Sequence, residues 1–243
     1  MAVSPSLPTI IVPARLASSR FPRKLLADAK GMPLILRTAH RLATQVPEYE
    51  IFFAVDGDEL AKPLEQNGFS CILTDPDLPS GTDRVAFVNI TLERKEIINV
   101  QADEPMVCRD HILALTKALR KPGADLATLA TPFHNTEDFN DPNQVKVVMD
   151  QDGFALFFSR SPIPYDRANK GVLSSLSCKH LGMYAYRQKF LKEFTNFPCG
   201  ALEKLEKLEQ LRALENGRRI SVELVKVGSI GVDREEDLAL LSF

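Results

Sequence analysis

The chain has 243 residues, which is long enough to bury the core of one large domain. Its 30 Lys and Arg nearly balance 32 Asp and Glu, and the net charge of -2 excludes a global basic field for nucleic acid. No apolar run approaches the roughly 20 residues that span a bilayer, and residues 1–8 lack the basic and apolar regions of a signal peptide. Four scattered cysteines, with no close pair, favour reduced thiols and a cytoplasmic protein.

Short apolar runs alternate with longer helical patterns in the first half of the chain. Strands are predicted at 9–14, 50–55, 96–101 and 124–131, and helices at 33–46, 58–68, 84–92 and 109–121. This alternation predicts an α/β fold, with a mostly parallel sheet and helices on both faces. Because ligands of such sheets bind beyond the carboxyl ends of the strands, the loops after Ala14, Val55 and Gln101 should surround one crevice.

The pattern changes between about Pro132 and Pro198. Three short strands, separated by Asn, Asp, Gly and Pro, are predicted at 144–150, 153–159 and 179–186. We interpret them as a small antiparallel elaboration of a single domain, with the apolar side chains of Phe154, Phe157 and Phe158 exposed. The chain then predicts one helix at 201–217 closed by Gly217, a strand at 220–227 and a final helix at 234–241.

Four cationic residues, Arg15, Arg20, Arg23 and Lys24, follow the first predicted strand within ten positions. Arg offers a bidentate fork to phosphate and Lys a point charge, so the loop suits the several negative charges of a triphosphate. A solvated loop is the alternative that these residues alone leave open. The loop is not a Walker P-loop, because the Gly-rich cradle and the GK[ST] ending are absent.

Two acidic clusters also fall where a predicted element begins or ends. Asp103 and Glu104 follow the strand at 96–101, and Asp233 precedes the last predicted helix. Mg²⁺ prefers one or two carboxylates together with phosphate oxygens and water, so either cluster suits that ion. An N-cap is the competing interpretation of Asp233.

The segment Ser80-Gly81-Thr82 follows a turn at the start of the helix predicted from residue 84. Its peptide and hydroxyl groups suit contacts with a base or a ribose. An ordinary helix cap is the alternative.

Eight segments, taken in order, resemble the 3-deoxy-manno-octulosonate cytidylyltransferases, or CMP-Kdo synthetases. They are "PARLASSRFPRK", "SGTDR", "NVQADEP", "NDPNQVKVVMD", "ALFFSRSPIP", "KHLGMYAYR", "LEKLEKLEQLRALE" and "GVDREEDL", and they cover nearly the whole chain. The resemblance implies an α/β fold of the nucleotide-diphospho-sugar transferase type, dimerised through the elaboration at 132–198. It also implies transfer of CMP from CTP to the anomeric hydroxyl of 3-deoxy-D-manno-octulosonate (Kdo), with release of pyrophosphate and with Mg²⁺ as cofactor.

The resemblance further implies the role of individual residues. The catalytic set is Arg15, Lys24, Asp103 and Asp233, of which the two aspartates are the Mg²⁺ ligands. The nucleotide-binding set is Pro13, Ala14, Arg15, Arg20, Lys24, Ser80, Gly81, Thr82, Arg84 and Gln101. The sugar-binding set is Gln101, Arg160, His180, Tyr184, Glu209 and Gln210, with Arg160 expected to pair with the carboxylate of the sugar acid.

The sequence departs from the family pattern at three places. Arg23 and Ala102 replace glycines, and Arg234-Glu235 replaces Thr-Pro. An alanine is harmless where φ is negative and costly where it is positive.

Two other functions are considered: the same reaction on the 8-amino analogue of Kdo or on a sialic-acid-type 2-keto acid, and a non-catalytic homologue that binds nucleotide or a partner protein. Retention of Asp103 and Asp233 argues against the non-catalytic homologue.

Overall fold

The computed structural model describes residues 6–18 and 20–242. The chain divides into two compact units, unit 1 formed by Met1–Ile112 with Ser229–Phe243 and unit 2 formed by Leu113–Gly228. The first five residues, where we expect no signal peptide, and Ser19 of the cationic loop lie outside the described residues. Within the described ranges no helix is long and apolar enough to cross a membrane.

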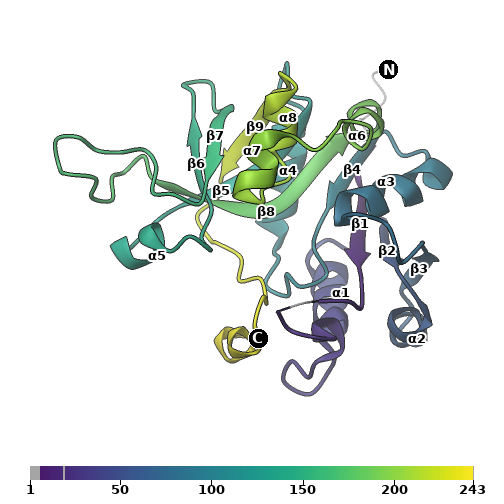
Figure 1. Ribbon diagram of the computed structural model, residues 1–243. Coiled ribbons are helices and arrows are strands. Elements are labelled where there is room, and N and C mark those ends of the chain that lie inside the picture. The colour runs from purple at the N-terminus through teal and green to yellow at the C-terminus, as the bar shows by residue number, and fades with distance from the viewer. Residues whose placement is uncertain (1–5, 19, 243) are drawn as a thin grey trace. The chain divides into compact units, whose positions relative to one another are not determined.

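Unit 1 contains a four-stranded parallel sheet in the order β3-β2-β1-β4 (Figure 1). Its strands are β1 (Thr9–Ala14), β2 (Ile51–Val55), β3 (Ser70–Leu73) and β4 (Glu96–Asn99). Its helical segments are η1 (Lys24–Leu26), α1 (Leu34–Gln45), α2 (Asp58–Gln66), α3 (Gly81–Leu92) and the 3-10 helix η2 (Glu235–Leu240). Every residue of β1 is buried, as expected of a central parallel strand covered on both faces.

The sequence correctly predicts these elements except β3, the short helix η1 and the type of the last helix. The strand β3 is a short edge strand, and its first and last residues are exposed, so it lacks the continuous apolar run that marks a buried strand. Gly68 has φ +82° just after α2 and provides the left-handed turn that ends this helix. The segment predicted as a final α-helix is a 3-10 helix without a buried side chain, so no apolar face stabilises a longer regular helix.

Unit 2 combines parallel and antiparallel strand pairs. Strand β5 pairs in parallel with β9 and antiparallel with β8, while β6 pairs antiparallel with β7 and β8. The strands are β5 (Leu126–Pro132), β6 (Lys146–Met149), β7 (Ala155–Ser159), β8 (Cys178–Arg187) and β9 (Ile220–Leu224). The helices are α4 (Arg109–Leu119), which begins in unit 1, α5 (Thr136–Asn140), α6 (Gln188–Phe194), α7 (Ala201–Glu206) and α8 (Leu211–Glu215). The predicted α/β class and the antiparallel pairing between 132 and 198 are both confirmed.

The single helix predicted at 201–217 is wrong. Helix α7 ends at Glu206, and Lys207 then adopts φ +54° before α8 begins. Leucines spaced by three residues drift around a helix, so one straight helix does not bury them all on one face. In the structure Leu205 is 81% exposed whereas Leu211 is fully buried. The break lets α8 bury Leu211 and Ala213, whereas α7 buries only Glu203.

A contact between the side chain of Glu215 and the first turn of α7 holds the two short helices against each other. The Glu215 carboxylate of α8 accepts hydrogen bonds from the backbone N–H groups of Leu202 (3.0 Å) and Glu203 (3.2 Å), at the start of α7. These are donors that the first turn of a helix leaves without partners. A side chain at Gly200 would overlap the same carboxylate. The local sequence pattern does not show this cap, because its two partners lie on different helices.

The expected exposure of Phe154 and Phe158 is also wrong, since they are 5% and 0% exposed. Strand β7 contains a bulge: Phe157 pairs with Val148 and Ala155 pairs with Met149, which leaves Leu156 as the extra residue. Leu156 is therefore the outward-facing apolar side chain of this strand, with 62% of its surface exposed. A simple two-residue alternation predicts the wrong face because the bulge interrupts it.

Candidate functional site

The cationic loop starts at the carboxyl end of β1, beside the loop that follows β2. The backbone N–H of Leu16 donates a hydrogen bond of 2.9 Å to Asp56 Oδ2, and Asp56 directly follows β2. The two loops are thus joined beyond the carboxyl ends of the strands, where ligands of parallel sheets bind. Sequence reasoning did not single out Asp56, although a carboxylate immediately after a strand end was a signal that could have identified it.

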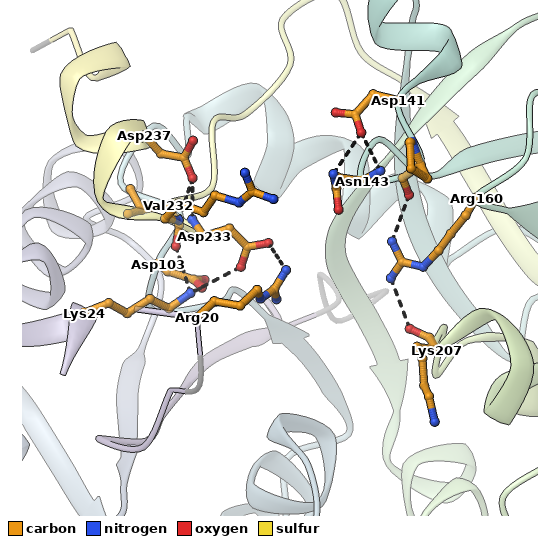
Figure 2. A network of polar contacts seen from close by, with 12 residues as sticks. Arg20, Lys24, Asp103, Asp141, Asn143, Arg160, Lys207, Val232, Asp233 and Asp237 are labelled. Atoms are coloured by element: carbon orange, nitrogen blue, oxygen red, sulfur yellow. Dashed lines mark hydrogen bonds and ion pairs between the residues drawn. The ribbon is translucent and has the colours of Figure 1, made fainter. Parts of the chain in front are cut away.

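Lys24 lies between the two predicted metal-binding aspartates (Figure 2). Its Nζ contacts Asp103, lies 3.6 Å from Asp233 Oδ1 and donates a hydrogen bond of 2.8 Å to the Val232 carbonyl. Arg20 donates a hydrogen bond of 2.7 Å to the other oxygen of Asp233. Two acidic clusters far apart in the sequence therefore meet on the cationic loop. The ammonium group also offsets the repulsion between the two carboxylates.

The C-terminal segment is held against the Asp103 loop by Glu104. The Ser229 hydroxyl donates a hydrogen bond to the Glu104 carboxylate, and the Val232 N–H donates one of 2.9 Å to the Asp103 carbonyl. A Cβ at Gly231 would lie only 2.8 Å from Glu104 Oε1, so glycine permits this close approach. Of the two acidic residues that the sequence offered here, Asp103 faces Lys24 and Glu104 fixes the returning chain.

The cap of the C-terminal 3-10 helix is formed by Asp237. Its Oδ2 accepts hydrogen bonds of 2.8 Å from the backbone N–H groups of Asp233 and Arg234. The Asp233 carboxylate itself contacts Arg20 and Lys24. The N-cap interpretation of the Asp233 side chain therefore does not describe this structure.

A cavity of about 240 Å³ opens at this edge of unit 1. Most of the predicted nucleotide-binding set lines it, together with both aspartates: Pro13, Ala14, Arg15, Arg20, Lys24, Gly81, Arg84, Gln101, Asp103 and Asp233. A Cβ at Gly81 would lie 3.3 Å from Pro13 Cγ and 3.5 Å from Gln101 Oε1, so the backbone of α3 approaches this wall closely. Gln101 is oriented by donating a hydrogen bond of 3.0 Å to Asn99 Oδ1.

The remaining residues of the α3 segment contribute in different ways. The Ser80 hydroxyl caps α3, accepting from the Asp83 N–H at 3.1 Å and donating to Asp83 Oδ2 at 2.7 Å, and Thr82 is buried. Arg84 is only 2% exposed, and its guanidinium donates to the Thr74 hydroxyl and to a backbone carbonyl. Burial lowers the pKa of Arg84, but an arginine keeps its charge in proteins. Arg84 is thus a fixed cation in the wall of the cavity.

The departures from the family pattern are accommodated differently. Arg23 has φ +57°, the left-handed region in which a glycine is unstrained. Its side chain forms an exposed ion pair with Glu59, apart from the carboxylates that Lys24 contacts. Ala102 does not have a positive φ and is buried, so its Cβ causes no backbone strain.

In unit 2, His180 lies on β8 with its ring buried. Its Nε2 is 2.9 Å from the Thr128 hydroxyl, which also lies 2.8 Å from the Met183 carbonyl. Because the hydroxyl donates to that carbonyl, the imidazole Nε2–H donates to the hydroxyl. Burial lowers the pKa of His180 to about 3. A neutral imidazole therefore packs between the rings of Phe158 and Tyr184.

We expect His180 to remain neutral down to pH 5, as measured by the nitrogen chemical shifts of its ring. An unfolded histidine binds a proton near pH 6.5, whereas folded His180 does so only near pH 3. This group therefore lowers the free energy of unfolding as pH falls below 6.5, by up to about 1.4 kcal/mol per pH unit. His180→Gln should show a correspondingly shallower loss of stability between pH 6.5 and 5. An imidazolium signal from His180 above pH 5 would contradict the assignment.

Tyr184 and Gln210 form a buried polar pair. The Tyr184 hydroxyl donates a hydrogen bond of 3.1 Å to Gln210 Oε1, and burial together with nearby Glu209 raises the pKa of Tyr184 well above its ordinary value. Gln210 is 4% exposed, and within the described part of the chain its Nε2 group has no hydrogen-bond partner. A buried donor without a partner is costly, so Gln210 offers an N–H to a ligand oxygen.

Arg160 follows β7 and contacts the end of α7 (Figure 2). Its guanidinium donates to the carbonyls of Pro142 (2.9 Å), Glu206 (2.7 Å) and Lys207 (3.4 Å). Three of its five N–H groups are used in this way, and two are left. Glu209 and Gln210 follow two and three residues after Lys207, whose carbonyl Arg160 holds. The structure therefore brings Arg160, Glu209, Gln210, Tyr184 and His180 together within unit 2.

Known proteins resemble this chain along nearly its whole length. Residues 9–220 match the cytidylyltransferase family. The 3-deoxy-manno-octulosonate cytidylyltransferase of Nitratiruptor sp. is 44% identical over 235 residues, covering 94% of this chain and 96% of the relative. That of Thermodesulfovibrio yellowstonii is 40% identical over 239 residues, covering 94% of each.

Solved structures show the same relationship. A CMP:2-keto-3-deoxy-manno-octonic acid synthetase complexed with CTP has a TM-score of 0.88 at 36% identity, covering 97% of this chain and 98% of that one. A cytidylyltransferase from Leptospira borgpetersenii, at 12% identity and a TM-score of 0.59, shares the fold. The sequence identity, the coverage and the residues gathered in the cavity lead to one conclusion: this chain belongs to the 3-deoxy-manno-octulosonate cytidylyltransferase family.

Proposed function

We propose that this chain transfers CMP from CTP to the anomeric hydroxyl of Kdo and releases pyrophosphate. The observation that carries the proposal is the meeting of Arg20 and Lys24 with Asp103 and Asp233 in one cavity at the ends of parallel strands. The names of the relatives and the CTP complex of the similar solved structure support it.

The cations of unit 1 are proposed to bind the triphosphate. Arg15 and Arg20 are exposed along the cavity, and Lys24 and Arg84 are held by hydrogen bonds deeper within it. During the reaction the anomeric hydroxyl loses its proton to water, its oxygen forms a bond to the α-phosphorus, and the bond from that phosphorus to the pyrophosphate oxygen breaks. Negative charge then grows on the leaving group, and cations that are already in place stabilise it without reorganising.

Asp103 and Asp233 are proposed to hold Mg²⁺ together with the triphosphate. In the described ranges no group of three or more His, Cys, Asp or Glu side chains forms a metal site, so the protein offers this carboxylate pair. Two carboxylates with phosphate oxygens and water are the hard ligands that Mg²⁺ favours, and the residues fit the ion. When bound, Mg²⁺ supplies a Lewis acid for phosphoryl oxygens.

Residues of unit 2 are proposed to bind the sugar acid. The two unused N–H groups of Arg160 suit its carboxylate, and the Gln210 amide N–H suits a hydroxyl. Glu209 lies beside Gln210 and is half-buried, and a carboxylate there is an acceptor for sugar hydroxyls. Neutral His180 and protonated Tyr184 add polar, uncharged groups beside the charged Arg160 and Glu209.

Pyrophosphate release tests the proposal directly. We expect the purified protein to release pyrophosphate with CTP, Mg²⁺ and Kdo, and to turn over ATP and GTP far more slowly, because a pocket sized for a pyrimidine excludes purines. The 8-amino analogue of Kdo and a sialic-acid-type 2-keto acid form the acceptor panel, and the names of the relatives favour Kdo over both. Equal turnover of all nucleotides, or no turnover of Kdo, would contradict the proposal.

We also propose a homodimer in which the region 132–198 contributes much of the contact. Its motivation is a set of large apolar side chains that unit 2 exposes: Leu156 (62%), Tyr165 (70%) and Leu176 (72%). Light scattering at micromolar concentration should give twice the monomer mass, and Leu156→Lys with Leu176→Lys should shift it to the monomer. A monomeric wild-type protein under these conditions would refute the dimer.

We place the reaction in the cytoplasm. The four cysteines are free thiols in the structure, which is usual for proteins of the reducing cytosol.

A further inference from the structure

Lys146 is a fully buried lysine to which the proposed reaction gives no role. It lies on β6, and its ammonium donates hydrogen bonds to the carbonyls of Asp141 (2.7 Å) and Arg160 (2.9 Å). Burial lowers the pKa of Lys146. Burying an ammonium is costly even when it is hydrogen-bonded, so general stability is a weak reason for placing a lysine here. Its hydrogen bond to the Arg160 carbonyl indicates a role in holding Arg160 in place.

Glu206 holds the same residue from the other side. Its carboxylate accepts hydrogen bonds from the Ser159 hydroxyl (2.7 Å) and from the backbone N–H of Arg160 (2.9 Å). Its own carbonyl accepts from the Arg160 guanidinium at 2.7 Å. Lys146 and Glu206 thus hold the backbone N–H and the carbonyl of Arg160, and the Glu206 carbonyl shares the guanidinium with the carbonyls of Pro142 and Lys207.

Arg160 in turn completes the C-terminal end of α7. The last carbonyls of a helix have no partner within it, and here the guanidinium binds those of Glu206 and Lys207. Lys207 then turns the chain with φ +54°, and Gln210 follows with its side chain buried against Tyr184. The position of this elbow, residues 207–210, decides where the unpartnered Gln210 N–H is presented.

We propose that Lys146 and Glu206 are positioning residues for the sugar acid. They hold Arg160 at the elbow and so fix both its two unused N–H groups and the Gln210 amide relative to each other. The inference rests on the proposed function, because it assumes that these groups bind the acceptor. The cations proposed to bind CTP belong to unit 1, whereas Lys146, Arg160 and Glu206 belong to unit 2. The expected signature is therefore a defect confined to the acceptor.

Steady-state kinetics with Kdo and CTP varied separately test this signature. Lys146→Met keeps the length of the side chain and removes its donors, and Glu206→Gln keeps the shape and removes the charge. Each should raise the KM for Kdo at least about tenfold and leave the KM for CTP within about twofold, as expected when a buried charged hydrogen bond is lost on one side of the reaction only. Lys204→Met on exposed α7 surface and Glu137→Gln on α5 are the matched controls and should behave as wild type.

Amide hydrogen exchange gives a readout that does not depend on activity. The two network variants should exchange faster at residues 207–211, and the controls should not. Ser159→Ala removes a single contact of Glu206 and should raise the KM for Kdo by about threefold. If Lys146→Met does not fold, the KM for Kdo of Ser159→Ala tests the positioning role instead.

The possible failures are distinguishable. A wild-type protein that does not turn over Kdo with CTP contradicts the proposed function. A wild-type protein that does so, with network variants that fold and keep a normal KM for Kdo, contradicts this inference alone. Equal increases in both KM values would also overturn it, because they would show a general structural role.

Discussion

Asp233→Asn is expected to lower kcat by at least about 100-fold, since a Lewis-acid metal contributes several kcal/mol and each tenfold in rate corresponds to about 1.4 kcal/mol. Asparagine has nearly the same shape and keeps one oxygen, but it lacks the charge that a Mg²⁺ ligand requires. Asp103→Asn should have an effect of similar size. The measurement is pyrophosphate release at saturating CTP, Kdo and Mg²⁺. CTP affinity without metal should not fall, because Arg15 and Lys24 are retained.

The matched control is Asp237→Asn, which changes the residue that caps the 3-10 helix. Asparagine keeps an acceptor oxygen, so this variant should retain nearly normal turnover. Near-normal kcat in Asp233→Asn at saturating Mg²⁺ would instead return Asp233 to a structural role, even though its side chain contacts Arg20 and Lys24.

Lys24→Met is expected to lower kcat/KM for CTP by about 100-fold, corresponding to the loss of a charge-assisted hydrogen bond of roughly 3 kcal/mol. The Lys24 side chain is only 13% exposed, so its charge is poorly screened by water and salt. Its removal also leaves Asp103 and Asp233 without the ammonium between them. Binding of CTP measured by calorimetry, with and without Mg²⁺, reports both consequences.

Arg23→Met provides the comparison one residue away. Arg23 is exposed and pairs with Glu59, so its removal should change CTP affinity by no more than about twofold, the usual size of an exposed ion pair. Equal losses in Lys24→Met and Arg23→Met would show that the loop acts through its total charge. The assignment of Lys24 to the phosphates would then be wrong.

The sequence by itself determined most of the elements of unit 1 and the place of its cavity. A parallel strand that is covered on both faces, such as β1, is buried at every residue and therefore reads as a continuous apolar run. This pattern can be recognised from a few consecutive residues. Ligands bind at the carboxyl ends of parallel strands, and this rule predicted that Arg15 and Asp103 lie at the same end of the sheet before any contact was known. The strand β3 was missed because its four residues, two exposed and two half-buried at a sheet edge, carry no such pattern.

Only the tertiary structure decided which of several chemically suitable side chains serves each purpose. Asp103 and Glu104 are adjacent carboxylates, and they differ because Ser229 and Gly231, from the far end of the chain, pack on Glu104. Asp233 is free of a capping role because Asp237 takes it. The break after α7 likewise depends on Arg160 and on the cap from Glu215, which lie outside α7. Local patterns report which residue types are present and with what period, whereas the partner of a polar side chain is set by segments that only the folded chain brings together.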